Sequence, residues 1–193
     1  MGGMLGMEYA LTQPSGLASL TVADSPASLV QWVGEANRLR AQLPLEVQQT
    51  LAYHEQHGTT DSEDYQDAML VFYRRHVCRV DPWPDCVTRA FEKLAHNPEV
   101  YHTMNGPSEF HVIGTLKTWD ITDRLHEINV PTLLLSGRYD EATPLIVETI
   151  HRSIPGSEWI LFENSSHMPH VEETNRYLQV LDRFLTRVEG EIS

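Results

Sequence analysis

Apolar and polar positions along the chain alternate between short strand-like runs and longer segments with helical spacing. Continuous apolar and β-branched runs lie at 17–23, 130–137 and 158–162. Apolar residues recur at helical spacing in the other segments, at 3–11, 28–42, 45–57, 62–78, 84–95, 144–154 and 171–188. Strands that alternate with helices along a chain are typical of βαβ units, so the pattern predicts an α/β fold with a parallel sheet.

The stretch from 27 to 104 breaks this alternation, because it holds helical segments in succession and no strand-like run. Ser62, followed by two acidic residues, predicts the N-cap of the third of these helices. We therefore expect two units: a core formed by residues 1–26 and 105–193, and an all-helical insertion formed by residues 27–104.

Composition narrows the class of protein. Hydrophobic residues make up 41% and charged residues 21%, which is typical of a globular chain. The sequence shows neither a long apolar run nor a basic leader followed by an apolar stretch, so we expect no membrane span and a cytoplasmic location. The formal net charge of −13 disfavours nucleic acid as a partner and modestly favours cationic ligands, such as free peptide N-termini. Two cysteines are too few for a disulfide framework, and their spacing does not fit a zinc site.

Two loops that each follow a predicted strand carry the candidate chemistry. Asp140 follows the strand at 130–137, and His167 follows the strand at 158–162. The carboxyl ends of parallel strands meet at one edge of a sheet, where α/β proteins assemble their sites. An imidazole can take a proton from a nucleophile, while a carboxylate fixes its tautomer and stabilises the imidazolium. We therefore predict Asp140 and His167 as the catalytic acid and histidine, with His170 only their neighbour.

The first residues predict where the nucleophile belongs. Met1-Gly2-Gly3 and the apolar helix that follows match the back half of a nucleophile elbow, G-x-S-x-G-G, in which small residues let the helix pack tightly. In this alignment Met1 takes the position after the nucleophile, and the serine itself lies one position upstream. The order of nucleophile, acid and histidine is that of α/β-hydrolases. Other serines lie in the wrong sequence context for the elbow: Ser15, Ser19, Ser25 and Ser108.

On these residues the chain resembles about the C-terminal two-thirds of a proline iminopeptidase of the α/β-hydrolase fold. Four stretches carry the resemblance: 2–9, 104–110, 137–144 and 165–170. It implies a serine aminopeptidase that releases an N-terminal residue, preferably proline, from short peptides with a free N-terminus. It implies an acyl-enzyme intermediate and neither a cofactor nor a metal.

The resemblance also implies roles for particular residues. The helical insertion is expected to form a cap over the active site. Glu109 is expected to bind the free amino group of the substrate, since a substrate without that group would leave the carboxylate unpaired. Asp81 and Asp85 could supply further acid, but they match the family only loosely.

Two catalytic parts of the family fall before Met1 in this alignment: the serine and a glycine-rich loop that donates to the oxyanion hole. The second oxyanion donor is the amide after the nucleophile, here that of Met1. We therefore expect a chain that keeps Asp140 and His167 but is inactive alone. We also expect an open sheet edge at 17–23, which favours aggregation.

Three interpretations stay open. The chain is a fragment of an active proline iminopeptidase, a truncated product that acts as a non-catalytic binding or interaction module, or part of a capped α/β-hydrolase of another specificity, such as an esterase or epoxide hydrolase.

Overall fold

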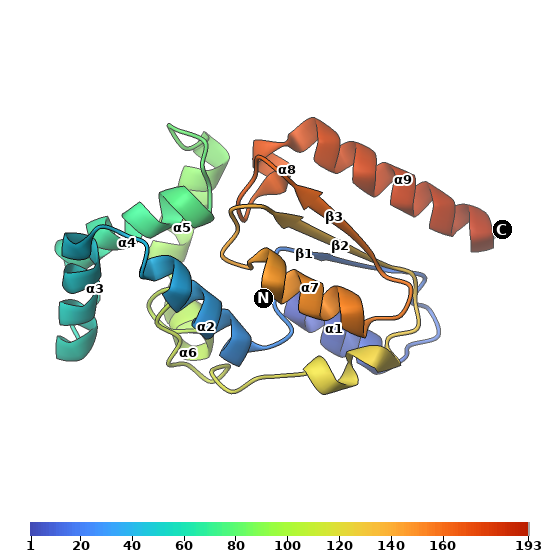
Figure 1. The fold of residues 1–193 in the computed structure, drawn as a ribbon, viewed down its shortest axis with the longest axis horizontal. Coiled ribbons are helices and arrows are strands. Elements are labelled where there is room, and N and C mark those ends of the chain that lie inside the picture. The colour runs from blue at the N-terminus through green and yellow to red at the C-terminus, as the bar shows by residue number, and fades with distance from the viewer. Residues whose placement is uncertain (193) are drawn as a thin grey trace.

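The computed structural model describes residues 1–192, in which three parallel strands form a sheet of order β1-β2-β3 (Figure 1). The strands are β1 (Leu20–Ala23), β2 (Thr132–Gly137) and β3 (Glu158–Phe162). Val22 pairs with Leu134, and Leu135 pairs with Ile160. The predicted α/β class and parallel sheet are confirmed, and β1 and β3 are the outer strands of the described sheet.

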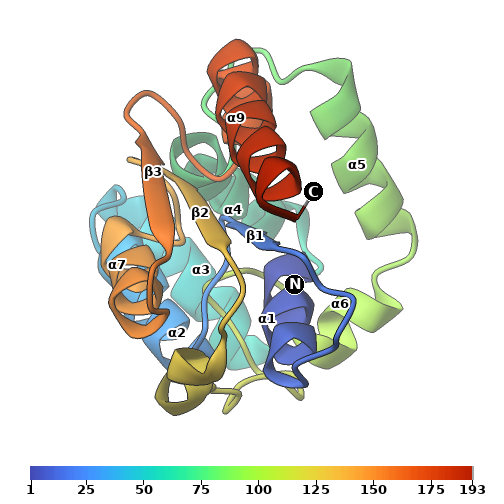
Figure 2. The same cartoon turned by 90° about the vertical axis from the view of Figure 1, so that its right-hand side faces the viewer.

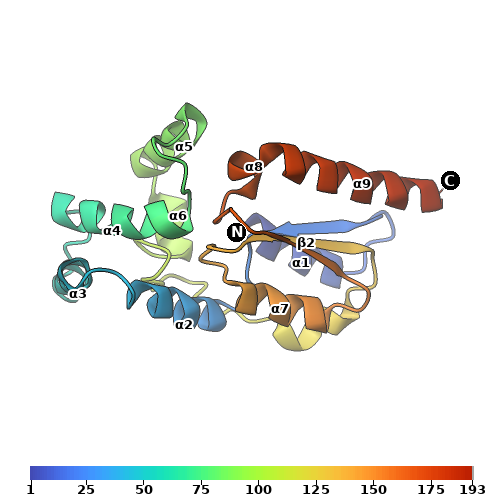
Figure 3. The ribbon, with the colours of Figure 1, turned by 45° about the horizontal axis from the view of Figure 1, so that its top comes forward.

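Helices cover both faces of the sheet. Helices α1 (Gly2–Leu11) and α7 (Pro144–Ser153) lie on one face, and α9 (Thr174–Ile192) lies on the other (Figures 1 and 3). Figure 2 shows the same layers with α9 above the strands. All six residues of β2 are buried, and successive side chains of a strand point to opposite faces. Leu134 accordingly packs in the α1 and α7 layer, whereas Leu133 and Leu135 pack toward α9.

Five α-helices lie between β1 and β2 in the sequence. They are α2 (Leu29–Arg40), α3 (Leu45–His57), α4 (Glu63–His76), α5 (Asp85–His96) and α6 (Glu99–Met104). The sequence predicted the first four, and α6 is an additional short helix. Helices α3, α4 and α5 lie beyond the carboxyl ends of the strands, away from the sheet (Figures 1 and 3). The division into a core and a cap at residues 27–104 stays a prediction that this arrangement favours.

Local sequence explains several element boundaries. The Ser62 hydroxyl accepts a hydrogen bond from the Tyr65 backbone N–H, which confirms the predicted N-cap of α4. Helix α3 ends at Gly58, whose φ of 65° lies in the left-handed region that glycine adopts at little cost. Pro144 begins α7, at a position where its missing N–H is not needed.

Two short elements complete the fold. A 3₁₀-helix, η1 (Thr122–Glu127), precedes β2, and a short helix, α8 (Pro169–Glu172), precedes α9. The single helix predicted at 171–188 is therefore two helices that meet at Glu173. Among residues 1–192, no helix combines the length and the apolar character that crossing a membrane requires.

Candidate active site

Asp140 and His167 meet at the carboxyl edge of the sheet. His167 Nδ1 lies 2.8 Å from Asp140 Oδ1, and the Asp140 side chain is fully buried. Asp140 Oδ1 also accepts a hydrogen bond of 2.8 Å from the Ala142 backbone N–H, which fixes the carboxylate within its own turn. With Nδ1 engaged by Asp140, Nε2 is the ring nitrogen left for a reacting group. The structure thus brings together the two residues that the sequence predicted as a pair.

The environment of His167 favours its protonated form. Burial alone would lower the pKa of the imidazole, but the charge of Asp140 and the hydrogen bond to it outweigh burial, and the pKa is raised. Glu109 adds to the increase, and the Met1 amino group opposes it. Charged groups from distant parts of the chain therefore act on one imidazole.

Close backbone packing holds the two loops together. The Arg138 backbone N–H donates to the Phe162 carbonyl at 2.9 Å, and the Tyr139 N–H donates to the Ser165 carbonyl at 3.0 Å. A Cβ on Gly137 would lie 2.1 Å from the Ser166 carbonyl oxygen, so a residue without a side chain is required there. The Ser166 hydroxyl is bound to Glu172, and the Ser165 hydroxyl to Glu173, on the far side of this turn.

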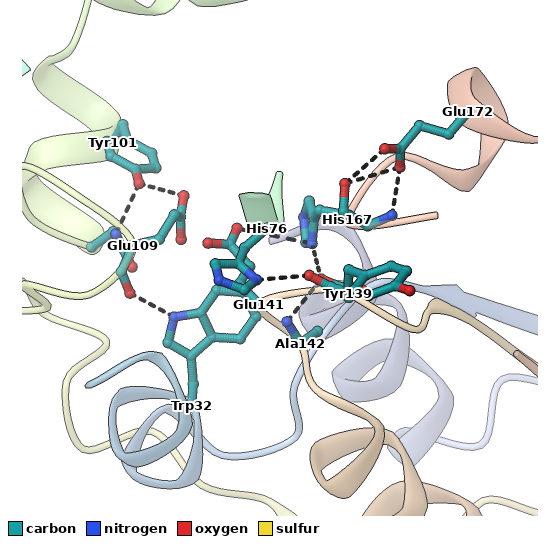
Figure 4. Close-up of polar contacts among 12 residues, drawn as sticks. Trp32, His76, Tyr101, Glu109, Tyr139, Glu141, Ala142, His167 and Glu172 are labelled. Carbon is teal, nitrogen blue, oxygen red and sulfur yellow. Dashed lines mark hydrogen bonds and ion pairs between the residues drawn. The ribbon is translucent and has the colours of Figure 1, made fainter. Parts of the chain in front are cut away.

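A pocket of about 140 Å³ lies beside His167. Its lining residues come from the start of the chain and α1, the loop after β1, α2, α6, the loop after α6 and the loop after β3: Met1, Met4, Asp24, Pro26, Leu29, Trp32, Tyr101, Asn105, Glu109, Leu116 and His167. Figure 4 shows Glu109 and His167 on opposite sides of this region, with Trp32 between them and below. The pocket therefore joins the sheet edge to the helical insertion.

Glu109 is held in this pocket from two sides. The Tyr101 hydroxyl donates to Glu109 Oε1, and the Trp32 indole N–H donates to the Glu109 carbonyl oxygen at 2.7 Å (Figure 4). The side chain is half-buried, and its charge is among those that raise the pKa of His167. Glu109 thus lines the pocket instead of only shaping the turn at Gly106-Pro107.

Glu141, within the stretch 137–144, is a further acid for which the sequence predicted no role. It is 1% exposed, its Oε1 lies 3.9 Å from His167 Nδ1, and its Oε2 has no hydrogen-bond partner in the described residues. Burial, followed by the charges of Glu109 and Asp140, raises its pKa well above the ordinary value. An acid next to another acid in a loop gives no sequence signal of burial, and only its position after Asp140 could have pointed to it.

Other candidates lie outside the pocket. Asp81 and Asp85 are exposed and do not line it, so the loose assignment of further acid to these residues is not supported. His170 lies in α8, directly after Pro169, and contacts the Tyr177 ring. Burial, and then the charge of His167, lowers the pKa of His170, as expected for a neighbour of the pair.

Known proteins have sequences that are similar to this chain. Residues 1–174 match the model of a family described as the alpha/beta hydrolase fold. The proline iminopeptidase of Saccharolobus solfataricus is 40% identical over 187 residues, and that of Heyndrickxia coagulans is 39% identical over 187 residues. Each alignment covers 97% of this chain, but the chain spans only 60% and 65% of these two relatives.

Solved structures of other proteins are similar to this chain in fold. The crystal structure of VinJ matches with a TM-score of 0.94 and 49% identity, over 96% of this chain and 63% of VinJ. The proline iminopeptidase of Mycobacterium smegmatis matches with a TM-score of 0.88 and 43% identity, over 99% of this chain and 64% of that protein. A thermophilic esterase, at 20% identity and a TM-score of 0.63, shares the fold. The chain therefore belongs to the alpha/beta hydrolase fold family.

Proposed function

We propose that Asp140 and His167 are the acid and base of a serine aminopeptidase that releases an N-terminal residue, preferably proline, from short peptides. The observation that carries this proposal is the 2.8 Å contact of His167 with Asp140 at a pocket that also holds the carboxylate of Glu109. The relatives named proline iminopeptidase support the choice of substrate. We place this activity in the cytoplasm, with no nucleic-acid partner.

The nucleophile in this proposal is a serine directly before the position of Met1. Met1 lines the same pocket as His167, and its amino group is close enough to lower the pKa of the imidazole. A serine at that position would place its hydroxyl near Nε2, and the backbone N–H of Met1 would serve as an oxyanion-hole donor. The 193-residue chain by itself is then expected to bind substrates without turnover.

The chemistry follows from these positions. His167 Nε2 takes the serine proton as the serine oxygen bonds to the carbonyl carbon of the first residue, and Asp140 stabilises the imidazolium. His167 then gives this proton to the leaving amine as the peptide C–N bond breaks. Water attacks the acyl-enzyme by the same route, with His167 again as the base, and the N-terminal residue leaves as a free amino acid.

Recognition of the free amine is assigned to Glu109 and Glu141. Glu141 Oε1 lies 3.9 Å from His167 Nδ1, and Glu109 lines the pocket beside His167. The charge of Glu109 raises the pKa of His167, and that of Glu141 raises the pKa of Tyr101, as acids placed to receive a cation do. A protonated substrate amine would supply the partner that Glu141 Oε2 lacks. A substrate with a blocked amine would leave this buried carboxyl unpaired, which is a strong basis for rejection.

The first experiment tests the nucleophile. The reading frame upstream of the Met1 codon is sequenced, and we expect a serine codon directly before it, within a G-x-S motif. The chain is then expressed with the segment that precedes the matching region in the Saccharolobus solfataricus relative. We expect this extended protein to hydrolyse prolyl-β-naphthylamide, and the matched variant with alanine at the serine to be inactive. An in-frame stop directly before Met1, or a folded extended protein without hydrolysis, would overturn the proposal.

The second experiment tests amine recognition in the 193-residue chain. Binding of prolinamide is compared with that of N-acetylprolinamide by isothermal titration, in the parent and in the Glu109→Gln variant. We expect the parent to prefer the free amine and the variant to lose about tenfold or more of that preference. Asp85→Asn, an exposed acid outside the pocket, is the matched control and should bind as the parent does. Equal binding of both ligands by the parent would favour an esterase-like specificity.

A further inference from the structure

Asp24 is a buried acid for which the proposed mechanism has no role. It follows β1 directly, its side chain is 8% exposed, and it lines the same pocket as His167. Its φ of 49° lies in the left-handed region, which a residue with a side chain adopts only at some cost. Its backbone N–H donates to the Leu135 carbonyl at 2.9 Å, which ties this turn to β2. The fold therefore holds Asp24 at a defined place next to the Asp140 loop.

Asp24 and Asp140 each have one carboxyl oxygen without a donor. Asp140 Oδ1 is engaged by His167 and the Ala142 N–H, whereas Asp140 Oδ2 has no partner among the described residues. Asp24 Oδ1 lacks a partner in the same sense. Leaving a buried oxygen without a donor costs free energy, and two carboxylates cannot help each other because both only accept. A single proton shared by the two side chains would give each of these oxygens a partner.

The surroundings of Asp24 favour its protonated form. Burial, and then the charge of Asp140 and the hydrogen bond to it, raises the pKa of Asp24 well above its ordinary value. Glu172, from α8, acts in the same direction, and only a hydrogen bond with the Gly137 backbone lowers the pKa. From α9, Tyr177 is an uncharged neighbour whose own pKa is raised by burial and then by Asp24. His167 and Met1 line the pocket beside it, and His167 is bound to Asp140.

We propose that Asp24 is a positioning residue that donates a carboxyl O–H to Oδ2 of Asp140, the oxygen that has no other donor among the described residues. This hydrogen bond holds Asp140 with Oδ1 toward His167 Nδ1, so Asp24 acts on the imidazole through Asp140. Its effect on catalysis rests on the proposed function, but the shared proton itself does not. The arrangement resembles other buried carboxyl pairs, in which one acid keeps its proton because two like charges cannot both ionise.

Two substitutions separate the hydrogen-bond donor from the branched shape of the side chain. Asp24→Asn keeps a donor of the same size that does not titrate, and Asp24→Leu removes the donor but keeps the branching and the number of heavy atoms of the side chain. In the 193-residue chain labelled with ¹³C at aspartate carboxyl carbons, the Asp24 signal is the one lost in D24N. We expect it at the position of a protonated acid at pH 7. The proposal is overturned if this carbon reports an ionised carboxylate at that pH.

A second spectroscopic measurement follows the His167–Asp140 hydrogen bond. The ¹H NMR signal of the proton on His167 Nδ1 is expected far downfield in the parent and in D24N. In D24L we expect this signal to be lost or broadened by exchange. Equal signals in all three proteins would show that Asp24 does not position the pair. Where D24L fails to fold, the carboxyl titration of the parent still decides whether Asp24 carries the proton.

Kinetics of the extended, serine-bearing protein separate the two proposals. We expect D24L to lower kcat by about tenfold to a hundredfold with little change in KM, and D24N to restore most of that loss. An inactive extended parent that still shows the protonated Asp24 would overturn the proposed function and leave this inference standing. An active extended parent in which Asp24 is ionised would overturn this inference and leave the proposed function standing.

Discussion

Gly137 sets how closely the loops of Asp140 and His167 approach each other. A Cβ there would meet the Ser166 carbonyl oxygen at 2.1 Å and the Ser165 carbonyl oxygen at 2.4 Å, and both are backbone atoms that cannot turn aside. We expect Gly137→Ala to lower the free energy of unfolding by about 3 kcal/mol or more, since overpacked cores lose this order of stability. It should also displace His167 from Asp140.

Gly34 offers the matched control for this change. It lies in the middle of α2, and a Cβ there would meet nothing within 4 Å. Gly34→Ala should raise the free energy of unfolding by about 0.5–1 kcal/mol, because glycine costs entropy inside a helix. Urea denaturation of both variants checks the pair. Equal stability of Gly137→Ala and the parent would show that the loops can move apart freely.

Glu141 predicts how stability depends on pH. Burial raises its pKa in the folded protein, so between about pH 4.3, the unfolded value, and the raised value the folded state binds more protons than the unfolded state. The contribution of Glu141 to the free energy of unfolding is fully present below this pH range. It is lost as pH rises through the range, by about 1.4 kcal/mol for each pH unit. Glu141→Gln does not titrate and should flatten this fall.

The control for Glu141 is an exposed acid with the opposite shift. The hydrogen bond with Arg138 lowers the pKa of Glu163, so its contribution is present above the unfolded pKa and lost as pH falls. Glu163→Gln should therefore leave the decline at rising pH in place. Urea midpoints measured from pH 4 to pH 8 compare the three proteins. Parallel curves for Glu141→Gln and the parent would contradict the assignment.

Residue types and their order predicted part of the site. Asp140 and His167 could be found because each follows a strand, and parallel strands bring their carboxyl ends together whatever the rest of the fold does. Glu141 and Asp24 could not be singled out. Their importance depends on burial and on which oxygen lacks a donor, and neither property is visible in a loop sequence.

Among elements, α1 depends on small residues at its start. A Cβ on Gly3 would lie 2.6 Å from Ser25 Cβ, whereas a Cβ on Gly2 would meet nothing within 4 Å. We expect Gly3→Ala to lower the free energy of unfolding by about 1–3 kcal/mol, because α1 would have to move away from the end of β1. Gly2→Ala should leave stability unchanged or raise it by less than about 1 kcal/mol. Thermal unfolding of the adjacent variants tests this, and equal effects would contradict the close approach.

A buried hydrogen bond connects the helical insertion to the sheet layer. The Thr143 hydroxyl, at the start of α7, donates to Glu35 Oε2 on α2 at 2.6 Å. Thr143→Val keeps the shape of the side chain and removes a hydrogen-bond donor to a charged group. We therefore expect the free energy of unfolding to fall by about 1.5–3 kcal/mol. Thr149→Val is the control: it breaks a neutral, partly buried bond with Gln31 between the same helices and should cost about 0.5–1.5 kcal/mol. Chemical denaturation measures both, and a smaller loss for Thr143→Val would contradict the ranking.

The elements themselves were predicted to different degrees. Strands and long helices repeat a pattern over enough residues to be recognised, as in β2 and α4. The short elements α6 and η1 have six residues each, too few for a period to appear. The break between α8 and α9 at Glu173 was missed because apolar spacing continues across it, while Glu173 accepts bonds from the loop before α8.

At the scale of the whole molecule, the protein carries a formal net charge of −13, and its pocket is itself lined by two acids, Asp24 and Glu109. Long-range attraction of a cation is screened by salt, whereas a contact with half-buried Glu109 is screened much less. Raising the ionic strength from about 0.01 M to about 0.15 M shortens the screening length from about 30 Å to about 8 Å. We therefore expect the affinity for prolinamide to fall a few-fold over this range.

Two comparisons isolate the two contributions. N-acetylprolinamide is uncharged and should bind equally at both ionic strengths, which excludes a general effect of salt on the pocket. Glu109→Gln should lower the affinity for prolinamide by the same factor at low and at high salt. The substitution removes a short-range contact and leaves most of the negative charge of the protein in place. Titration calorimetry at both ionic strengths measures these factors. If the affinity of prolinamide for the parent does not change with salt, recognition of the amine is confined to the pocket and the acidic surface plays no part in it.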